Sequence, residues 1–282
     1  MLSTRHIRRR FERAASTFDS ADFVHTATRD GLLQRIEPLL IDAQTVVDLG
    51  CATGGAARPL KKRFPKSRLV GVDFACNMLR TANTRKSWFT RSAFVQADAR
   101  ALPFANESVD VVFSNQLLPW IANPDEVFAE VARVLRKGGV FAFATLGPDS
   151  LLEISRAWRE MDDGHHVSRF PDMHNLGDGL VNAGLRDPVL DVDRLTVSYN
   201  SADALLADLS AAGARNTLRD RSRSLTGKRK FQGMLAALER ATVDGKIAVE
   251  LELVFAHCWG AGPRMDPANY RIDANRIPLR NK

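Results

Sequence analysis

From residue 45 onward the sequence alternates short runs rich in β-branched and aliphatic residues with longer amphipathic stretches. A short apolar run followed by a helix-length stretch is typical of βαβ units, in which helices connect parallel strands. The pattern therefore predicts a doubly wound α/β fold with a mostly parallel, seven-stranded sheet. The expected strands cover 45–49, 68–72, 93–96, 109–114, 138–145, 186–199 and 246–259, the last two as a hairpin-like edge pair.

Length and composition favour a single domain. A chain of 282 residues, 45% of them hydrophobic, can bury one large core. We expect an N-terminal helical cover over 1–44, a ligand-binding core over 45–199 and 246–262, and an inserted lid over 200–245. A helix is expected over 124–135, ended by a turn at Lys137, Gly138 and Gly139, because glycine accepts the left-handed conformation of helix C-termini.

Charge and cysteine content narrow the class of protein. The net charge of +7 favours encounters with anionic partners, so at this point nucleic acid, an acidic protein and a membrane surface all stay open. The cysteines Cys51, Cys76 and Cys258 are scattered and lack metal-ligand spacing, which predicts neither disulfides nor a zinc site and favours the cytoplasm. The basic N-terminus lacks the apolar run of a signal peptide, and no stretch reaches transmembrane length.

The segment 46–54 carries the first chemical signal, an apolar strand that runs into a glycine turn and then a helix. Gly50 and Gly54 let the backbone approach a ligand closely, and the following helix offers free N–H groups. An ordinary tight turn would look similar. Asp73, which closes the next strand 25 residues after Asp48, favours ligand binding, because its carboxylate can accept both hydroxyls of a ribose.

The turn differs from the dinucleotide-binding fingerprint in its glycine spacing. Asp48 would repel a pyrophosphate but suits a ligand with an amino group and a sulfonium, and Asp98 can accept an adenine amino group. Together these elements resemble the class I S-adenosylmethionine-dependent methyltransferases, whose turn usually reads D-x-G-x-G-x-G, with Ala52 here at the middle glycine. The resemblance implies S-adenosyl-L-methionine as cofactor, held by Asp48, Gly50, Ala52, Gly54, Asp73, Phe74, Met78, Asp98, Ala99, Asn115 and Gln116.

The segment 110–120 would meet both cofactor and substrate in that class of enzyme. It contains no N-P-P-Y or D-P-P-Y motif, which amino-directed nucleic-acid methyltransferases use to hold an exocyclic amine, so a DNA-modifying role is disfavoured. Trp120 is a candidate wall of the substrate pocket, and an aromatic that anchors a loop to the core is the alternative.

Several later segments are more specific than the glycine turn: 147–151, 166–178, 183–191, 208–216, 225–227 and 257–260. With them the chain resembles the malonyl-acyl-carrier-protein O-methyltransferases of biotin synthesis from about residue 10 to residue 262. The resemblance implies methylation of the free carboxylate of a malonyl thioester on an acidic carrier protein. A carboxylate is ionised at neutral pH and needs no general base, so none is expected.

The remaining site residues follow from this resemblance. Phe18 lies in a segment, 11–19, that covers the cofactor in the family, and many relatives have tyrosine there. Tyr199 ends a strand where the insertion begins. The basic cluster over 215–230 is a candidate docking surface for the carrier protein, or simply a solvated face. The expected substrate-binding residues are Phe18, Trp120, Tyr199, Arg219, Arg221 and Arg223.

Other functions stay open. Metal binding by His165, His166 and His174 is disfavoured, because no cysteine or carboxylate stands at ligand spacing. A methyltransferase-fold protein with another substrate, including an arginine hydroxylase, is one alternative. A non-catalytic, cofactor-binding assembly factor is another, and Ala52 gives it some basis. No nucleic-acid partner is expected, since basic and aromatic residues do not interleave as base stacking would require. No membrane partner is expected either, since no stretch reaches transmembrane length.

Overall fold

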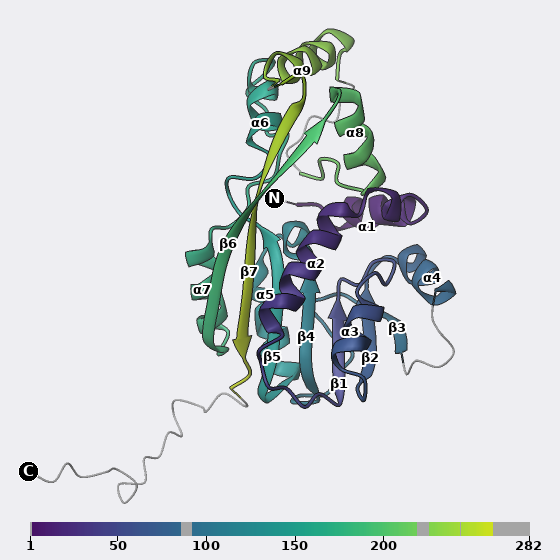
Figure 1. Ribbon diagram of the computed structural model, residues 1–282, viewed down its shortest axis with the longest axis vertical. Coiled ribbons are helices and arrows are strands. Elements are labelled where there is room, and N and C mark those ends of the chain that lie inside the picture. Colours follow the sequence, from purple (N-terminus) through teal and green to yellow (C-terminus); the bar gives the residue numbers. More distant parts are fainter. Residues whose placement is uncertain (1, 86–91, 219–225, 243, 262–282) are drawn as a thin grey trace, which may run out of the picture.

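The computed structural model describes residues 2–85, 92–218, 226–242 and 244–261. In this part of the chain a seven-stranded sheet has the order β3-β2-β1-β4-β5-β7-β6 (Figure 1). The strands β1 to β5 are parallel, and β7 runs antiparallel to both of its neighbours, β5 and the edge strand β6. The predicted doubly wound, mostly parallel fold is therefore confirmed. The strands are β1 Thr45–Leu49, β2 Arg68–Asp73, β3 Ser92–Gln96, β4 Val109–Asn115, β5 Leu135–Leu146, β6 Arg186–Tyr199 and β7 Ile247–Trp259.

The central strands are buried on both faces, which explains their continuous apolar sequence. Neighbouring residues of a strand point to opposite faces. Val47 accordingly packs with Phe128 and Phe143 on one face, and Val46 packs with Leu32 and Phe255 on the other. Strands β2 and β4 pair with β1 on its two sides, so the strand order reverses at β1. Ligands of such sheets bind at the carboxyl ends of the strands at this switch point.

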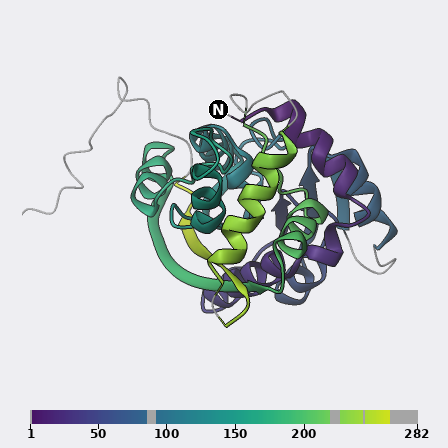
Figure 2. The ribbon, with the colours of Figure 1, turned by 90° about the horizontal axis from the view of Figure 1, so that it is seen from above.

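Helices cover both faces of the sheet (Figures 1 and 2). On one face, α2 (Phe23–Ile36) and α3 (Ala57–Arg63) contribute Leu32 and Leu60 to the core. On the other face, α5 (Pro124–Val134) and α7 (Met173–Asn182) contribute Phe128 and Leu176. Helix α4 (Cys76–Thr84) follows β2.

The prediction that a turn at Gly138 ends the helix over 124–135 was wrong. Helix α5 ends at Val134, and the next residue, Leu135, already has extended backbone angles and begins β5. Gly138 lies inside that strand with a φ of +75°, where the pairing with β4 shifts in register. The glycine thus accommodates an irregularity in the pairing of β4 with β5, which a sequence pattern does not distinguish from a helix cap.

The β6–β7 pair extends beyond the rest of the sheet. Pairing between β5 and β7 stops at Leu146 and Leu253, whereas β6 and β7 stay paired as far as Tyr199 and Ile247. A separate apolar cluster packs against this extension, and it includes Ile154, Leu205 and Met234. Its helices are α6 (Leu152–Arg159), α8 (Ala202–Ala211) and α9 (Lys228–Arg240). Two of these helices belong to the expected insertion, whose function as a lid stays a prediction.

The N-terminal segment crosses the carboxyl end of the sheet as α1 (Thr4–Ala14) and the 3-10 helix η1 (Phe18–Ala21). The carboxylate of Glu12 accepts hydrogen bonds from the backbone N–H groups of Cys76 (2.8 Å) and Asn77 (2.7 Å) at the start of α4. Asp19 accepts a hydrogen bond from the Thr53 hydroxyl (2.6 Å) in the glycine turn. A carboxylate at a helix N-terminus is favourable, because free N–H groups and the helix dipole attract negative charge. These bonds fix the cover over the switch point.

Candidate active site

A cavity lies at the carboxyl ends of β1, β2 and β4, under the N-terminal cover. It brings together residues from Thr4 to Ala122, far apart in the sequence. Ten residues selected from the sequence line it: Phe18, Gly50, Ala52, Asp73, Phe74, Asp98, Ala99, Asn115, Gln116 and Trp120. The lining thus combines carboxylates and amides on the strand ends with aromatic rings above them.

Asp73 is held in one orientation at the end of β2. Its two carboxylate oxygens accept hydrogen bonds from the backbone N–H groups of Ala52 (3.0 Å) and Ala75 (2.8 Å). Burial raises the pKa of Asp73 to about 6, against the lowering effect of these backbone bonds. Since a carboxylate can accept about four hydrogen bonds, two sites remain for a ligand's hydroxyls.

The glycine turn is anchored on β2 by the N–H groups of Gly50 and Cys51, which both donate to the carbonyl of Val72. Ala52 has a φ of +44°, in the left-handed region that favours glycine. Its methyl group packs in the cluster that includes Phe74 and the cover. The departure from the usual motif is therefore accommodated by a strained backbone rather than by a different loop.

Gly54 is not among the residues that line the cavity. It has a φ of +80°, and a Cβ atom there would come within 3.2 Å of Ala82 and 3.3 Å of Phe94. Glycine is required at this position because the backbone has a left-handed conformation and because α4 and β3 leave no room for a Cβ atom. Met78 is also buried in the cluster beneath the cover and does not line the cavity.

Asp48 is buried at the end of β1, next to the lining residue Leu49. Within the described residues, its Oδ2 atom has no hydrogen-bond partner. Burial, together with the nearby charge of Asp73, raises the pKa of Asp48 to about 7. An unpartnered carboxylate in this position favours a ligand that carries positive charge.

The end of β4 supplies further unsatisfied polar atoms. The Asn115 side-chain amide donates to the carbonyl of His25 (2.8 Å), and its Oδ1 atom has no partner among the residues described. Gln116 is buried with a φ of +58°, and its Nε2 atom is likewise unpartnered there. Both residues line the cavity, so a ligand can satisfy these groups.

Ten of the lining residues were not selected from the sequence, and two of them, Arg100 and His25, carry titratable side chains. Arg100 pairs with Asp98 at 2.7 Å and lowers the pKa of that carboxylate. Its place two residues after Asp98 was an available signal. His25 lies on α2, with its ring centroid 4.8 Å from that of Phe18. Burial lowers the pKa of His25 to about 4, so its ring is neutral at neutral pH, and nothing in the local sequence marks it.

Aromatic rings from three segments of the chain lie over the cavity. Phe11 on α1 meets the ring of Trp120 edge-on, with centroids 5.0 Å apart and planes at 89°, and it also lies 6.4 Å from Phe74. Such edge-to-face contacts stabilise the closed arrangement beyond simple area burial. Trp120 thus lies in the cavity wall and contacts the cover at the same time.

The other expected substrate residues lie elsewhere. Tyr199 does not line the cavity; its hydroxyl donates to Asp208 (2.8 Å), and burial with this bond raises its pKa. It packs with the α6–α8–α9 cluster. Arg219, Arg221 and Arg223 lie outside the described residues. In the part of the chain that the structure covers, no cluster of three or more His, Cys, Asp or Glu could hold a metal ion, and no helix is long and apolar enough to cross a membrane.

Residues 47–143 match the family described as a methyltransferase domain. This match, the sheet order and the cavity at its switch point define the chain as a class I methyltransferase, which uses S-adenosylmethionine. A solved structure from Thermotoga maritima, titled a SAM-dependent methyltransferase and possible histamine N-methyltransferase, has a TM-score of 0.55. It is 19% identical and covers 90% of this chain and 99% of that one, which shows a shared fold.

Curated relatives cover nearly the whole chain. A malonyl-acyl-carrier-protein O-methyltransferase of Gallionella capsiferriformans is 35% identical over 94% of this chain and 94% of its own length. One of Laribacter hongkongensis is 38% identical over 92% and 90%. The chain belongs to the malonyl-acyl-carrier-protein O-methyltransferase family.

Proposed function

We propose that the protein transfers the methyl group of S-adenosylmethionine to the free carboxylate of malonyl-acyl-carrier protein, giving the methyl ester early in biotin synthesis. The observation that carries this proposal is the full-length similarity to relatives of that name. The similarity includes the cover and the β6–β7 insertion, which lie outside the 47–143 segment that methyltransferases of many kinds share.

The cavity residues fit the cofactor. Asp73 offers two acceptor sites for the ribose hydroxyls, and Asp98 is placed for the adenine amino group. The unpartnered Asp48 oxygen suits the positive charge of the amino and sulfonium groups, and Asn115 and Gln116 offer polar atoms nearby. Gly50 and Ala52 let the turn approach the ligand, with Phe74 and Ala99 beside it, while Gly54 and Met78 support the turn and α4 from behind.

The reaction needs no proton transfer. S-adenosylmethionine supplies an electrophilic methyl group. A malonyl oxygen forms the new O–C bond as the C–S bond breaks, and the sulfur keeps the electron pair. The carboxylate is already ionised at neutral pH, so the neutral His25 ring needs no role as a base. The aromatic cover and the fixed strand ends contribute by positioning the reactants and excluding water.

A groove next to the cavity suits the uncharged arm of a carrier thioester. Its volume is about 490 Å³, and it shares Ile121 and Ala122 with the cavity wall. Most of its remaining lining is apolar, including Leu118, Phe170 and Leu218. A long thioester could lie in this groove and present its malonyl end to the cavity. The cytoplasm as the place of the reaction stays a prediction.

Intact-protein mass spectrometry tests the proposal. Malonyl-carrier protein incubated with enzyme and S-adenosylmethionine should gain one methyl group, whereas acetyl-carrier protein, which lacks the free carboxylate, should gain none. Asp73→Asn should weaken cofactor binding by about 1.5–3 kcal/mol, because hydrogen bonds to a charged acceptor are lost. Cofactor binding with no methylation of any malonyl thioester would instead favour the assembly-factor alternative.

A further inference from the structure

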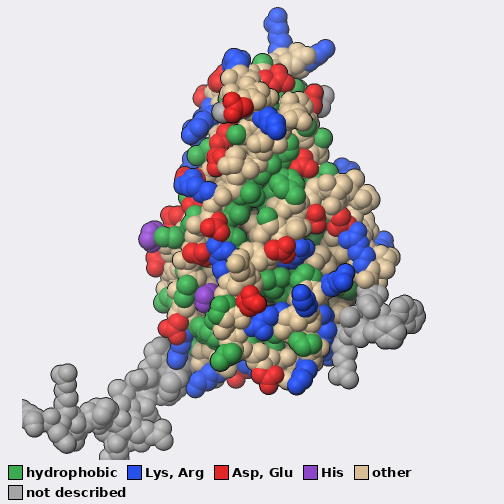
Figure 3. All heavy atoms as spheres, in the orientation of Figure 1, with side chains coloured by type: hydrophobic (Ala, Val, Ile, Leu, Met, Phe, Trp, Pro, Cys, Tyr) green, Lys and Arg blue, Asp and Glu red, His purple; other side chains and the backbone are tan. Residues whose placement is uncertain are grey.

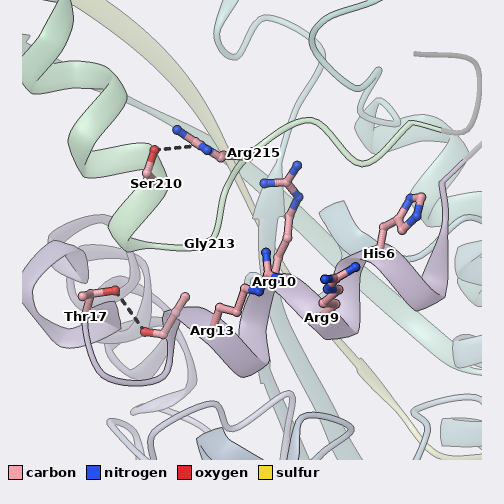
Figure 4. Close-up of a pocket in the computed structure, with 9 residues that line it drawn as sticks. His6, Arg9, Arg10, Arg13, Thr17, Ser210, Gly213 and Arg215 are labelled. Carbon is pink, nitrogen blue, oxygen red and sulfur yellow. Dashed lines mark hydrogen bonds between the residues drawn. The ribbon is translucent and has the colours of Figure 1, made fainter. Parts of the chain in front are cut away.

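A second cleft, distinct from the methyl-transfer cavity, lies on the other side of the cover. Its volume is about 500 Å³, and it opens between α1 and the segment that follows α8 (Figure 4). The basic residues that line it are His6, Arg9, Arg10, Arg13 and Arg215. No carboxylate lines it among the described residues. A cleft with this lining concentrates positive potential and favours an anionic partner.

Three of the four arginines that line the cleft have no compensating ion pair among the described residues. Within the described residues, Arg9, Arg13 and Arg215 form no salt bridge, and all three are exposed. Arg215 instead donates to the Ser210 hydroxyl at 2.9 Å. Glu12 is the one acidic residue of α1, and its carboxylate accepts hydrogen bonds from the start of α4 and pairs with Arg8 rather than with an arginine of the cleft. The cleft therefore keeps its charge.

This arrangement is unfavourable for α1 on its own. Five of its eleven residues are arginine, and like charges four positions apart, such as Arg9 and Arg13, repel by a few tenths of a kcal/mol, roughly. Elsewhere charges of both signs are mixed: Figure 3 shows basic and acidic side chains interspersed over one face of the molecule. An acidic partner bound in the cleft would offset the repulsion along α1.

The cleft adjoins the route into the active site. The N–H of Ser3 donates to the carbonyl of Thr217 (3.1 Å), and Leu2 forms a β-bridge with Leu218. The apolar groove begins at this bridge, since Leu2 and Leu218 line it. On the cleft side, Arg10 reaches from α1 and donates to the carbonyl of Asn216 (3.3 Å).

We propose that this arginine cleft is the docking site for the acidic surface of the carrier protein. The inference rests on the proposed function and adds the place of recognition. Carboxylates of the carrier bind the arginines of α1 and Arg215. The thioester arm then passes the Leu2–Leu218 bridge along the apolar groove to the cavity. The sequence-based candidates at 219–223 lie outside the described residues, whereas this site is formed by residues whose contacts are described.

Charge reversal on α1 tests the docking site. The double variant Arg9→Glu/Arg13→Glu should raise the KM for malonyl-carrier protein about tenfold or more, since carboxylates would now meet like charge. Neither residue lines the cavity, so the KM and kcat for a short malonyl thioester without a carrier should stay unchanged. Added salt should weaken the wild-type reaction with carrier protein and affect the variant much less.

A matched control is Arg58→Glu/Lys62→Glu, the same charge change at two exposed positions four residues apart on α3. It should leave the carrier-protein KM close to the wild-type value. The proposal is overturned if the α1 variant has a wild-type KM for the carrier protein, if the α3 variant raises it equally, or if the short thioester is affected as strongly. Calorimetric binding of carrier protein separates docking from chemistry. If no malonyl thioester is methylated but the α1 variant alone loses carrier binding, the docking site stands and the proposed reaction fails.

Discussion

Ala52 shows how one residue can depart from a motif and keep its geometry. Its backbone has the left-handed conformation that glycine normally supplies, and its N–H still bonds the carboxylate of Asp73. Left-handed backbone costs an L-residue about 1–2 kcal/mol. Two effects offset this cost: the methyl group packs against the cover, and alanine loses less conformational entropy on folding than glycine does. The turn is thus strained but fully formed.

Ala52→Gly should leave the free energy of unfolding within about 1 kcal/mol of wild type, because relief of the strain offsets the lost methyl contacts and the entropy of glycine. Urea denaturation measures this, and calorimetric titration should show cofactor affinity retained. Ala129→Gly, at an exposed position of α5 with ordinary helical backbone, is the control and should lose about 1 kcal/mol. An equal loss in both variants would show that Ala52 is not strained.

At the scale of elements, the cover depends on a few polar contacts with the sheet and α4. Glu12 bonds two backbone N–H groups, and Asp19 bonds both Thr53 and Arg85. Phe11 and Phe18 on the same segment close the cavity. The polar contacts that hold α1 and η1 therefore also keep these two rings over the cavity.

Glu12→Ala should release the cover, because it removes two charge-assisted hydrogen bonds worth about 1.5–3 kcal/mol each at most. We expect faster hydrogen exchange in α1, unchanged exchange in β4, and weaker cofactor binding. Arg8→Ala, which removes only the exposed 3.7 Å pair with Glu12, should change exchange little. Wild-type protection of α1 in Glu12→Ala would mean that the aromatic contacts alone hold the cover.

For the whole molecule, three buried titratable groups at one end of the sheet contribute to the dependence of stability on pH. Burial raises the pKa of Asp48 to about 7 and of Asp73 to about 6, from 3.8, so each makes folding less favourable as pH rises through that interval. Burial lowers the pKa of His25 from 6.5 to about 4, so this group makes folding more favourable as pH rises between those values. Near pH 5 the combined effect of the two carboxyls on the free energy of unfolding is larger than the opposite effect of His25, so these three groups together make the fold less stable as pH rises.

Asp48→Asn should remove the largest of these effects. At pH 8 we expect the variant to be more stable than wild type by on the order of 4 kcal/mol, and at pH 4 to be similar, as measured by chemical denaturation. Wild-type affinity for S-adenosylmethionine should rise from pH 6 to 8, since ionised Asp48 attracts its positive charge, and the variant should lose this rise. A parallel pH dependence of stability in both proteins would contradict the burial of a titrating Asp48.

The sequence determined those features that depend on local pattern. Apolar strand cores, the glycine turn and Asp73 at the end of the next strand were predictable, because a strand buried on both faces and a tight βα turn each restrict nearby residues. The carboxyl ends of parallel strands meet at one edge, and the resemblance to class I methyltransferases indicated which strand-end residues would meet the cofactor there. The seven strands and the family were confirmed on this basis.

Only the tertiary structure decided which distant segments meet. Gly138 has the same local signature in a helix cap and in an irregular strand, and its partner β4 decided between them. His25 became a neutral cavity residue because α2 packs under Phe18, and Tyr199 bonded Asp208 rather than facing the cavity. The arginine cleft joins α1 to a segment about 200 residues later in the chain. Local periodicity carries no information about such contacts, since burial and electrostatic fields depend on where folding places each element.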